Sequence, residues 1–118
     1  MKAQSNIYPS VEQYDSQYLA VPTNITEIIK ENEIFYEYDM VLVKQGLDKK
    51  QQINAVCQVL ILDKFSIIHQ LDVAHGLYID NGMKAWIAAM VAESNRCTDL
   101  VDTNQPAVPV WPEYVEVV

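Results

Sequence analysis

Glycine is scarce in this chain of 118 residues, which contains only three. Several tight-turn types need a positive φ that residues other than glycine rarely adopt, so an all-β protein with many turns usually contains more. The scarcity therefore favours helices over a turn-rich sheet. It also leaves no material for a phosphate-binding loop, and neither the P-loop motif nor G-x-G-x-x-G occurs.

Basic residues are also few, since eight Lys and Arg stand against 16 Asp and Glu and give a net charge of −8. A DNA duplex carries one negative charge per ~1.7 Å of its length, so an acidic chain is repelled by it. Anionic membrane surfaces repel such a chain for the same reason. We therefore expect neither direct nucleic-acid binding nor membrane association.

Long apolar runs are absent, and no stretch approaches the roughly 20 apolar residues of a membrane-spanning helix. The first ten residues lack the apolar core of a signal peptide. The two cysteines, Cys57 and Cys97, stand at no recognised spacing, which is weak support for a disulfide. Together these features predict a cytoplasmic protein with reduced thiols.

Catalytic motifs are missing as well, including the G-x-S-x-G elbow and the H-E-x-x-H zinc motif. The nearest approach to a metal site is the series His69, Asp72 and His75. On one helix the two histidines would lie about 120° apart, so the three side chains cannot converge on one ion without distortion. We expect no cofactor and no enzymatic activity. A metal-dependent enzyme using these three residues is only a remote alternative.

The segment 46–62 carries the clearest helical signal of the features that are present. Asp48 can cap a helix that has Gln51 at its third position, which is the capping-box pattern. The apolar residues that follow have the ideal spacing of a core stripe: Ile53, Val56, Cys57, Leu60 and Ile61. This pattern predicts a helix over 49–62.

A second helix is expected over 66–75, with Ser66 as its cap and Gly76 as its stop. A single long helix over 49–75 is the alternative. The inward side of the short helix would hold Ile67, Ile68, Leu71 and Ala74.

The last predicted helix covers 81–95, with Asp80 or Asn81 as its cap, and Cys97 is expected just beyond its end. It repeats the spacing of the segment 49–62 with Met83, Trp86, Ile87, Met90 and Val91. The two stripes are therefore expected to face each other in one core.

The segment 24–45 is predicted to be the first helix, with Asn24 as its cap and Gly46 as the left-handed residue after its last turn. Its second half, residues 34–43, is apolar nearly all round a helical wheel, which is typical of a helix central in its domain or buried in an oligomer. The same residues fit a strand, with one face formed by Ile34, Tyr36, Tyr38, Met40 and Leu42. The helix is favoured because both caps fit and no turn signal interrupts the segment.

The complete prediction is an all-α fold, a small bundle of about four helices with an extended, aromatic-containing arm at each end. The helical domain covers residues 23–96. Residues 1–22 form the N-terminal arm, and the proline-rich residues 97–118 form the C-terminal arm. Each arm either packs on the core of its own chain or docks on a partner.

Acidic residues are concentrated in the first predicted helix, where the members are Glu27, Glu31, Glu33, Glu37 and Asp39. On a helical wheel these five point in several directions, which favours a solvated surface. A row of acids can also imitate the phosphates of a nucleic acid. A DNA-mimicking inhibitor of a nucleic-acid-binding protein is therefore the alternative function.

An acidic helical domain with aromatic arms and no active site is most economically a protein-interaction module. It would bind another protein stoichiometrically, as an assembly or accessory component or as an inhibitor. Because aromatic side chains carry much of the energy of such interfaces, we choose arm aromatics and three acids as candidates. These partner-binding candidates are Tyr14, Tyr18, Glu31, Glu33, Glu37, Trp111 and Tyr114. Arms of this kind can exchange between subunits, so we also expect a homodimer.

Overall fold

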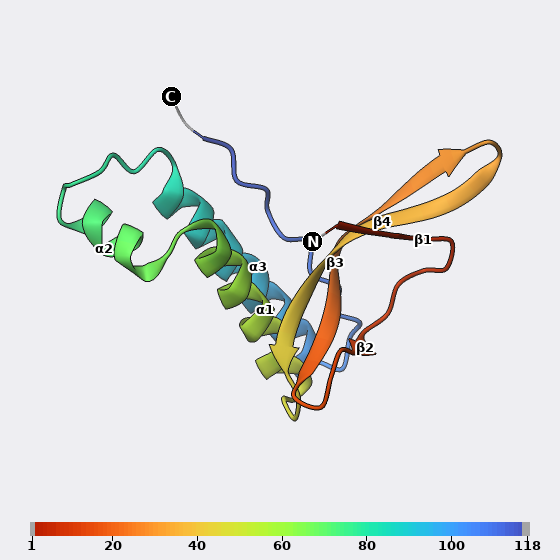
Figure 1. Ribbon diagram of the computed structural model, residues 1–118. Coiled ribbons are helices and arrows are strands. Elements are labelled where there is room, and N and C mark those ends of the chain that lie inside the picture. The colour runs from red at the N-terminus through yellow and green to blue at the C-terminus, as the bar shows by residue number, and fades with distance from the viewer. Residues whose placement is uncertain (1, 117–118) are drawn as a thin grey trace.

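The computed structural model describes residues 2–116 and combines three helices with a four-stranded antiparallel sheet (Figure 1). The elements, in chain order, are β1 (Lys2–Ser5), β2 (Glu12–Gln13), β3 (Tyr18–Lys30), β4 (Glu33–Lys44), α1 (Lys49–Lys64), α2 (Ile67–Ala74) and α3 (Met83–Asp102). The predicted all-α bundle of four helices is therefore wrong, because the fold contains a sheet as well as helices. Residues 1, 117 and 118, which belong to the two predicted arms, lie outside the described residues.

The error lies in the segment 24–45, where a long hairpin of β3 and β4 replaces the predicted helix. Lys30 pairs with Glu33, so only Glu31 and Asn32 form the turn. Their φ values are 52° and 65°, the positive values of the two-residue turns that match the twist of the strands. Asparagine tolerates this conformation at residue 32, whereas Glu31 adopts it although glutamate does not favour it. The turn thus forms without glycine, so the low glycine content does not exclude this hairpin.

Composition explains why this segment forms strands. β3 and β4 are rich in β-branched and aromatic side chains, which pack well on a pleated surface. Asn24, the predicted helix cap, lies instead at an irregularity of the pairing between Thr23 and Thr26, with a φ of 51°. The local cap pattern was thus a weaker signal than the composition of the whole segment.

The strand alternative for residues 34–43 is confirmed, but its inward face is the opposite one to that expected. Val41 and Val43 are buried at 5% and 2% exposure, whereas Leu42 between them is exposed. Side chains alternate between the two faces of a strand, so a shift of one residue exchanges the core face for the outer face.

The sheet has the order β1–β4–β3–β2, so two short strands flank the long hairpin (Figure 1). β1 pairs with residues 36–39 of β4, and β2 pairs with residues 19–20 of β3. The outer edge of β3 from residue 21 to 30 pairs with no strand within residues 2–116. Much of the chain before residue 22 therefore belongs to the sheet.

The predicted capping of the first two helices after the hairpin is confirmed. Asp48 accepts a hydrogen bond from the Gln51 N–H at 2.8 Å, and the Gln51 side chain accepts one from the Asp48 N–H at 3.1 Å, which completes the capping box of α1. The Ser66 hydroxyl accepts a hydrogen bond from the His69 N–H at 3.1 Å. Because Ser66 starts a new helix, the segment 49–75 contains two helices and not one.

The last helix, α3, is confirmed in place but runs seven residues further than expected, from an end at 95 to Asp102. Asp80 accepts a hydrogen bond from the Lys84 N–H at 3.0 Å, although the residue at the cap position is Gly82 with a φ of 91°. Cys97 lies within this helix and is fully buried, whereas it was expected beyond the helix end.

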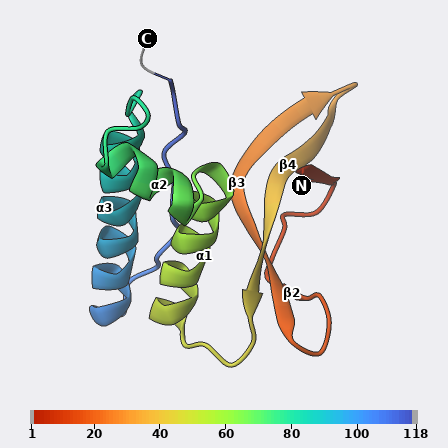
Figure 2. The same ribbon diagram turned by 60° about the vertical axis from the view of Figure 1, so that its left-hand side comes forward.

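The core lies between α1, α3 and the nearer half of the sheet, and the chain after α3 runs back through this space (Figure 2). Its buried members are Val41, Val43, Ile53, Val56, Cys57, Met90, Cys97 and Trp111. The expected contact between the stripes of α1 and α3 is confirmed at Met90 and Trp86, which pack in the same cluster as Ile53, Val56 and Cys57. Val91, the last member of the predicted α3 stripe, is instead 45% exposed. The far half of the β3–β4 hairpin projects away from the helices (Figure 2).

Candidate functional site

The two tyrosines of the predicted N-terminal arm lie in and beside the turn that leads from β2 into β3. Tyr14 and Tyr18 are 60% and 40% exposed. The Tyr18 carbonyl accepts a hydrogen bond from the Tyr14 N–H at 3.0 Å, and the Asp15 carboxylate accepts one from the Tyr18 N–H at 2.8 Å. The turn is therefore ordered by its backbone, and both rings remain available to solvent.

The three acidic candidates lie on the hairpin. Glu31 and Glu33 are exposed at its tip, and Glu37 lies further along β4, where β1 pairs with it. The Lys2 ammonium lies 2.8 Å from the Glu37 carboxylate, and its hydrogen bond holds the pKa of Glu37 below the ordinary value. Glu37 is thus neutralised by Lys2 and does not form a continuous row of free acids with the other two.

The two aromatic candidates of the C-terminal segment contact the protein's own chain. Trp111 is 5% exposed and belongs to the core. The Tyr114 hydroxyl donates a hydrogen bond to the Asn81 carbonyl at 2.8 Å, and its ring makes edge contacts with Phe65 and Trp86 at centroid distances of 5.0 and 5.9 Å. The seven candidates are therefore spread over the N-terminal turn, the hairpin and the C-terminal segment, and the structure does not bring them together in one surface.

The histidine series lies on α2 and just after it. The His69 ring stacks on Phe65 at a centroid distance of 5.7 Å and lies 5.4 Å from the Tyr78 ring. Within residues 2–116, no three His, Cys, Asp or Glu side chains are placed to hold a metal ion together. The structure thus places His69 among aromatic rings.

A group of exposed apolar side chains lies on α2 and the loop that follows it. Six large apolar side chains there are between 53% and 81% exposed: Ile67, Ile68, Leu71, Leu77, Tyr78 and Ile79. We call this set the α2 surface. It lies at the end of the molecule remote from the hairpin tip (Figure 1).

The prediction that Ile67, Ile68, Leu71 and Ala74 face the core is wrong, because all four are exposed and Val73 is the buried residue of α2. The sequence pattern identified an amphipathic helix but not what its apolar side would cover. The loop residues Leu77 and Ile79 were also missed. Leu77, Tyr78 and Ile79 follow directly after Gly76, the predicted helix stop. Three successive large apolar residues in a loop could have indicated this surface from the sequence.

A groove of about 600 Å³ adjoins the α2 surface. Phe65 and His69 form one side, the loop from Leu77 to Asn81 forms another, and Tyr114 belongs to the C-terminal segment that lines it. Burial raises the pKa of Tyr114 above the ordinary value, and the protonated hydroxyl donates its hydrogen bond to the Asn81 carbonyl. The site therefore offers exposed aliphatic side chains beside a groove whose lining combines aromatic rings with the acids Asp80 and Glu116.

Comparison with protein-family models, with curated proteins and with solved structures found no match to this chain. None of the helices in residues 2–116 combines the length and the apolar character that crossing a membrane requires.

Proposed function

We propose that this chain is a small acidic protein-interaction module that acts by stoichiometric binding to another protein. The observation that carries the proposal is the α2 surface, a cluster of six exposed large apolar side chains. A soluble monomer rarely leaves such a cluster in water unless a partner covers it.

The partner chemistry follows from the shape of the site. The groove beside Phe65 and His69 has room for a large apolar side chain, and the exposed Leu77 and Ile79 line it together with the acids Asp80 and Glu116. Ile68 is an exposed residue of the α2 surface outside the groove. Fully desolvated anchors of this kind carry most of the energy of an interface. We therefore propose a partner that inserts an apolar anchor into the groove and covers the aliphatic side chains around it.

The homodimer expected from the sequence is a separate proposal, supported by a different feature. The outer edge of β3 from residue 21 to 30 is unpaired within the described residues. Unpaired strand edges are surfaces through which two copies of a chain can join. We also retain the cytoplasm as the proposed location, because Cys57 and Cys97 are both free thiols.

The test of the binding proposal compares substitutions at two positions where the wild-type side chains are almost equally exposed. Ile68 on the α2 surface is 73% exposed, and Ile29 near the hairpin tip is 71% exposed. Tagged wild-type chain, Ile68→Asn and Ile29→Asn are used for affinity capture from native lysate, and the affinity for the captured protein is then measured with purified components. We expect Ile68→Asn to weaken binding by about tenfold or more, which is ~1.4 kcal/mol, and Ile29→Asn to leave it unchanged.

Equal loss in both variants, or in neither, would refute the assignment of binding to the α2 surface. The salt dependence of the complex tests the alternative function. An apolar interface is nearly insensitive to salt, whereas an affinity that falls steeply with salt would support the DNA mimic instead.

A further inference from the structure

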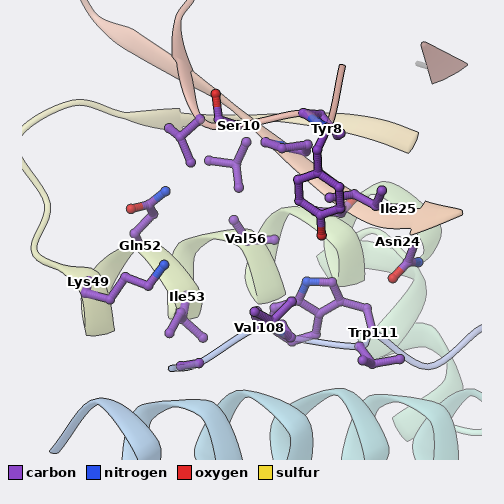
Figure 3. Close-up of a pocket in the computed structure, with 18 residues that line it drawn as sticks. Tyr8, Ser10, Asn24, Ile25, Lys49, Gln52, Ile53, Val56, Val108 and Trp111 are labelled. Carbon is purple, nitrogen blue, oxygen red and sulfur yellow. The ribbon is translucent and has the colours of Figure 1, made fainter. Parts of the chain in front are cut away.

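An apolar cavity of about 320 Å³ lies between the N-terminal segment, β3, α1 and the C-terminal segment (Figure 3). Ile53 and Val56 of α1 form its floor together with Val108, and residues 8–11 form the opposite wall. This volume is at the lower end of the range for small-molecule pockets, which are typically apolar with a few polar groups. The cavity is separate from the α2 surface, with which it shares no residue.

Trp111 supplies an unused hydrogen-bond donor at this cavity. The residue is only 5% exposed, yet no described residue accepts a hydrogen bond from its indole N–H. The other tryptophan differs, because the Trp86 N–H donates to the Pro112 carbonyl at 2.9 Å. Every side-chain nitrogen or oxygen within residues 2–116 that is completely inaccessible to solvent has a hydrogen-bond partner. Because the Trp111 N–H has no partner, it must be in contact with accessible space. Figure 3 shows the ring nitrogen on the side of the indole that faces the cavity.

The charge of the cavity is opposite to that of the chain. No Asp or Glu is among its 18 lining residues, although the whole chain has 16 acids, and the single charged side chain of the lining is Lys49. The neighbouring Lys50 is neutralised by Asp102 at 2.9 Å, whereas Lys49 has no ion-pair partner within residues 2–116. The lining would therefore attract an anionic group that the rest of the surface repels.

The polar groups lie at two ends of the cavity. Figure 3 shows Lys49 and Gln52 at one end and Tyr8, Asn24 and Trp111 at the other, with the apolar side chains between them. Along α1, the distance from Lys49 to Val56 is about 10 Å, since each helical residue adds 1.5 Å. A ligand that satisfies both ends must therefore carry its polar groups at the two ends of an apolar body.

We propose that this cavity binds a small amphipathic carboxylate of about eight carbon atoms. Its carboxylate lies against the Lys49 ammonium, its apolar body covers Ile53 and Val56, and an acceptor oxygen at its far end receives the Trp111 N–H. Such a molecule matches the apolar length, supplies the missing acceptor and complements Lys49, the one charged residue of the lining. Binding of this ligand is independent of protein binding at the α2 surface.

The experiment is an NMR titration of the full ¹⁵N-labelled chain with 8-hydroxyoctanoate, which carries a carboxylate at one end and a hydroxyl oxygen at the other. The two indole N–H signals are assigned with Trp86→Phe. We expect the Trp111 signal to move with a Kd on the order of 1 mM or below, and the Trp86 signal to stay in place because its N–H already has an acceptor. Octanoate, which lacks the far acceptor, should shift the Trp111 signal less.

Two lysine variants and an uncharged probe test the charge assignment. Lys49→Gln should weaken 8-hydroxyoctanoate binding about two- to fivefold, the effect expected of one solvent-accessible charge pair. Lys50→Gln is the matched control and should leave it unchanged. Binding of 1,8-octanediol, which has no charge, should be the same in Lys49→Gln as in the wild type. A Trp111 signal that does not move at about 10 mM probe, or equal effects of the two lysine variants, would overturn the proposal.

Discussion

The Glu93 carboxylate of α3 accepts a hydrogen bond from the Val110 N–H at 2.6 Å and thereby fastens the C-terminal segment to the helix. The same carboxylate accepts two hydrogen bonds from the Arg96 guanidinium, both at 2.7 Å. Its side chain is 12% exposed, so these contacts are partly shielded from water. This attachment places Trp111, the next residue, in the core.

Glu93→Gln should lower the free energy of unfolding by about 1–3 kcal/mol, the usual value of hydrogen bonds to a charged group. The Arg96 hydrogen bonds hold the pKa of Glu93 below its ordinary value, with a further contribution from the Val110 N–H. The stabilisation is therefore complete above the unfolded pKa of about 4.3 and is lost as the pH falls through the lower pKa of the folded state. Urea unfolding from pH 7 to pH 3 measures both effects.

The difference in the free energy of unfolding between wild type and Glu93→Gln should thus become smaller toward pH 3. Asp99→Asn is the control, because it removes an exposed acid from the same helix and should change stability by at most about 0.5 kcal/mol. A difference in the free energy of unfolding that stays constant with pH would show that the Glu93 charge does not hold the C-terminal segment on α3.

Because both residues of the hairpin turn have positive φ values, we expect two changes there to have opposite effects on stability. Replacing Glu31-Asn32 by Asn-Gly should stabilise the protein by roughly 0.5 kcal/mol, because these residues favour the positive φ values at both positions. Asn32→Val should destabilise it by about 1–2 kcal/mol, since a β-branched residue is strained there. Thermal unfolding measures both. A helix over 24–45 would instead lose about 1 kcal/mol on gaining the glycine.

Trp111 and Tyr14 should differ sharply on replacement by alanine. Trp111→Ala removes a core side chain and should cost about 3–5 kcal/mol of stability, whereas Tyr14→Ala removes an exposed ring and should change stability by no more than about 0.5 kcal/mol. Circular dichroism during denaturant unfolding gives both values. A small effect of Trp111→Ala would mean that the indole is not packed in the core.

Both cysteines should be unreactive in the folded protein. Cys57 and Cys97 are 4% and 0% exposed, and burial raises the pKa of each thiol, so little reactive thiolate is present near neutral pH. Ellman's reagent should label neither thiol until urea unfolds the chain. Ser16→Cys provides the positive control, because residue 16 lies in the exposed turn before β3. Rapid labelling of a wild-type thiol would contradict the packing of α1 on α3.

The helical half of the molecule was largely predictable from local pattern. Asp48 and Ser66 cap their helices with hydrogen bonds to residues three positions away. The spacing of the apolar residues from Ile53 onward is enough to predict which face of α1 is buried. These signals lie within a few residues of one another. The hairpin was missed because the Asn24 and Gly46 pattern also fits helix ends, and because the Glu31-Asn32 turn carries no glycine.

The acidic charge, the three helices after the hairpin and the core-facing residues of α1 follow directly from the order of residues along the chain. Which apolar side chains are covered depends on the three-dimensional packing, which buries Trp111 and leaves Ile68 and Ile79 in water. This packing also brings residues 8–11, α1 and the C-terminal segment together around one cavity. The physical reason is that a helical period identifies an apolar face, whereas what covers that face depends on contacts between segments far apart in the chain.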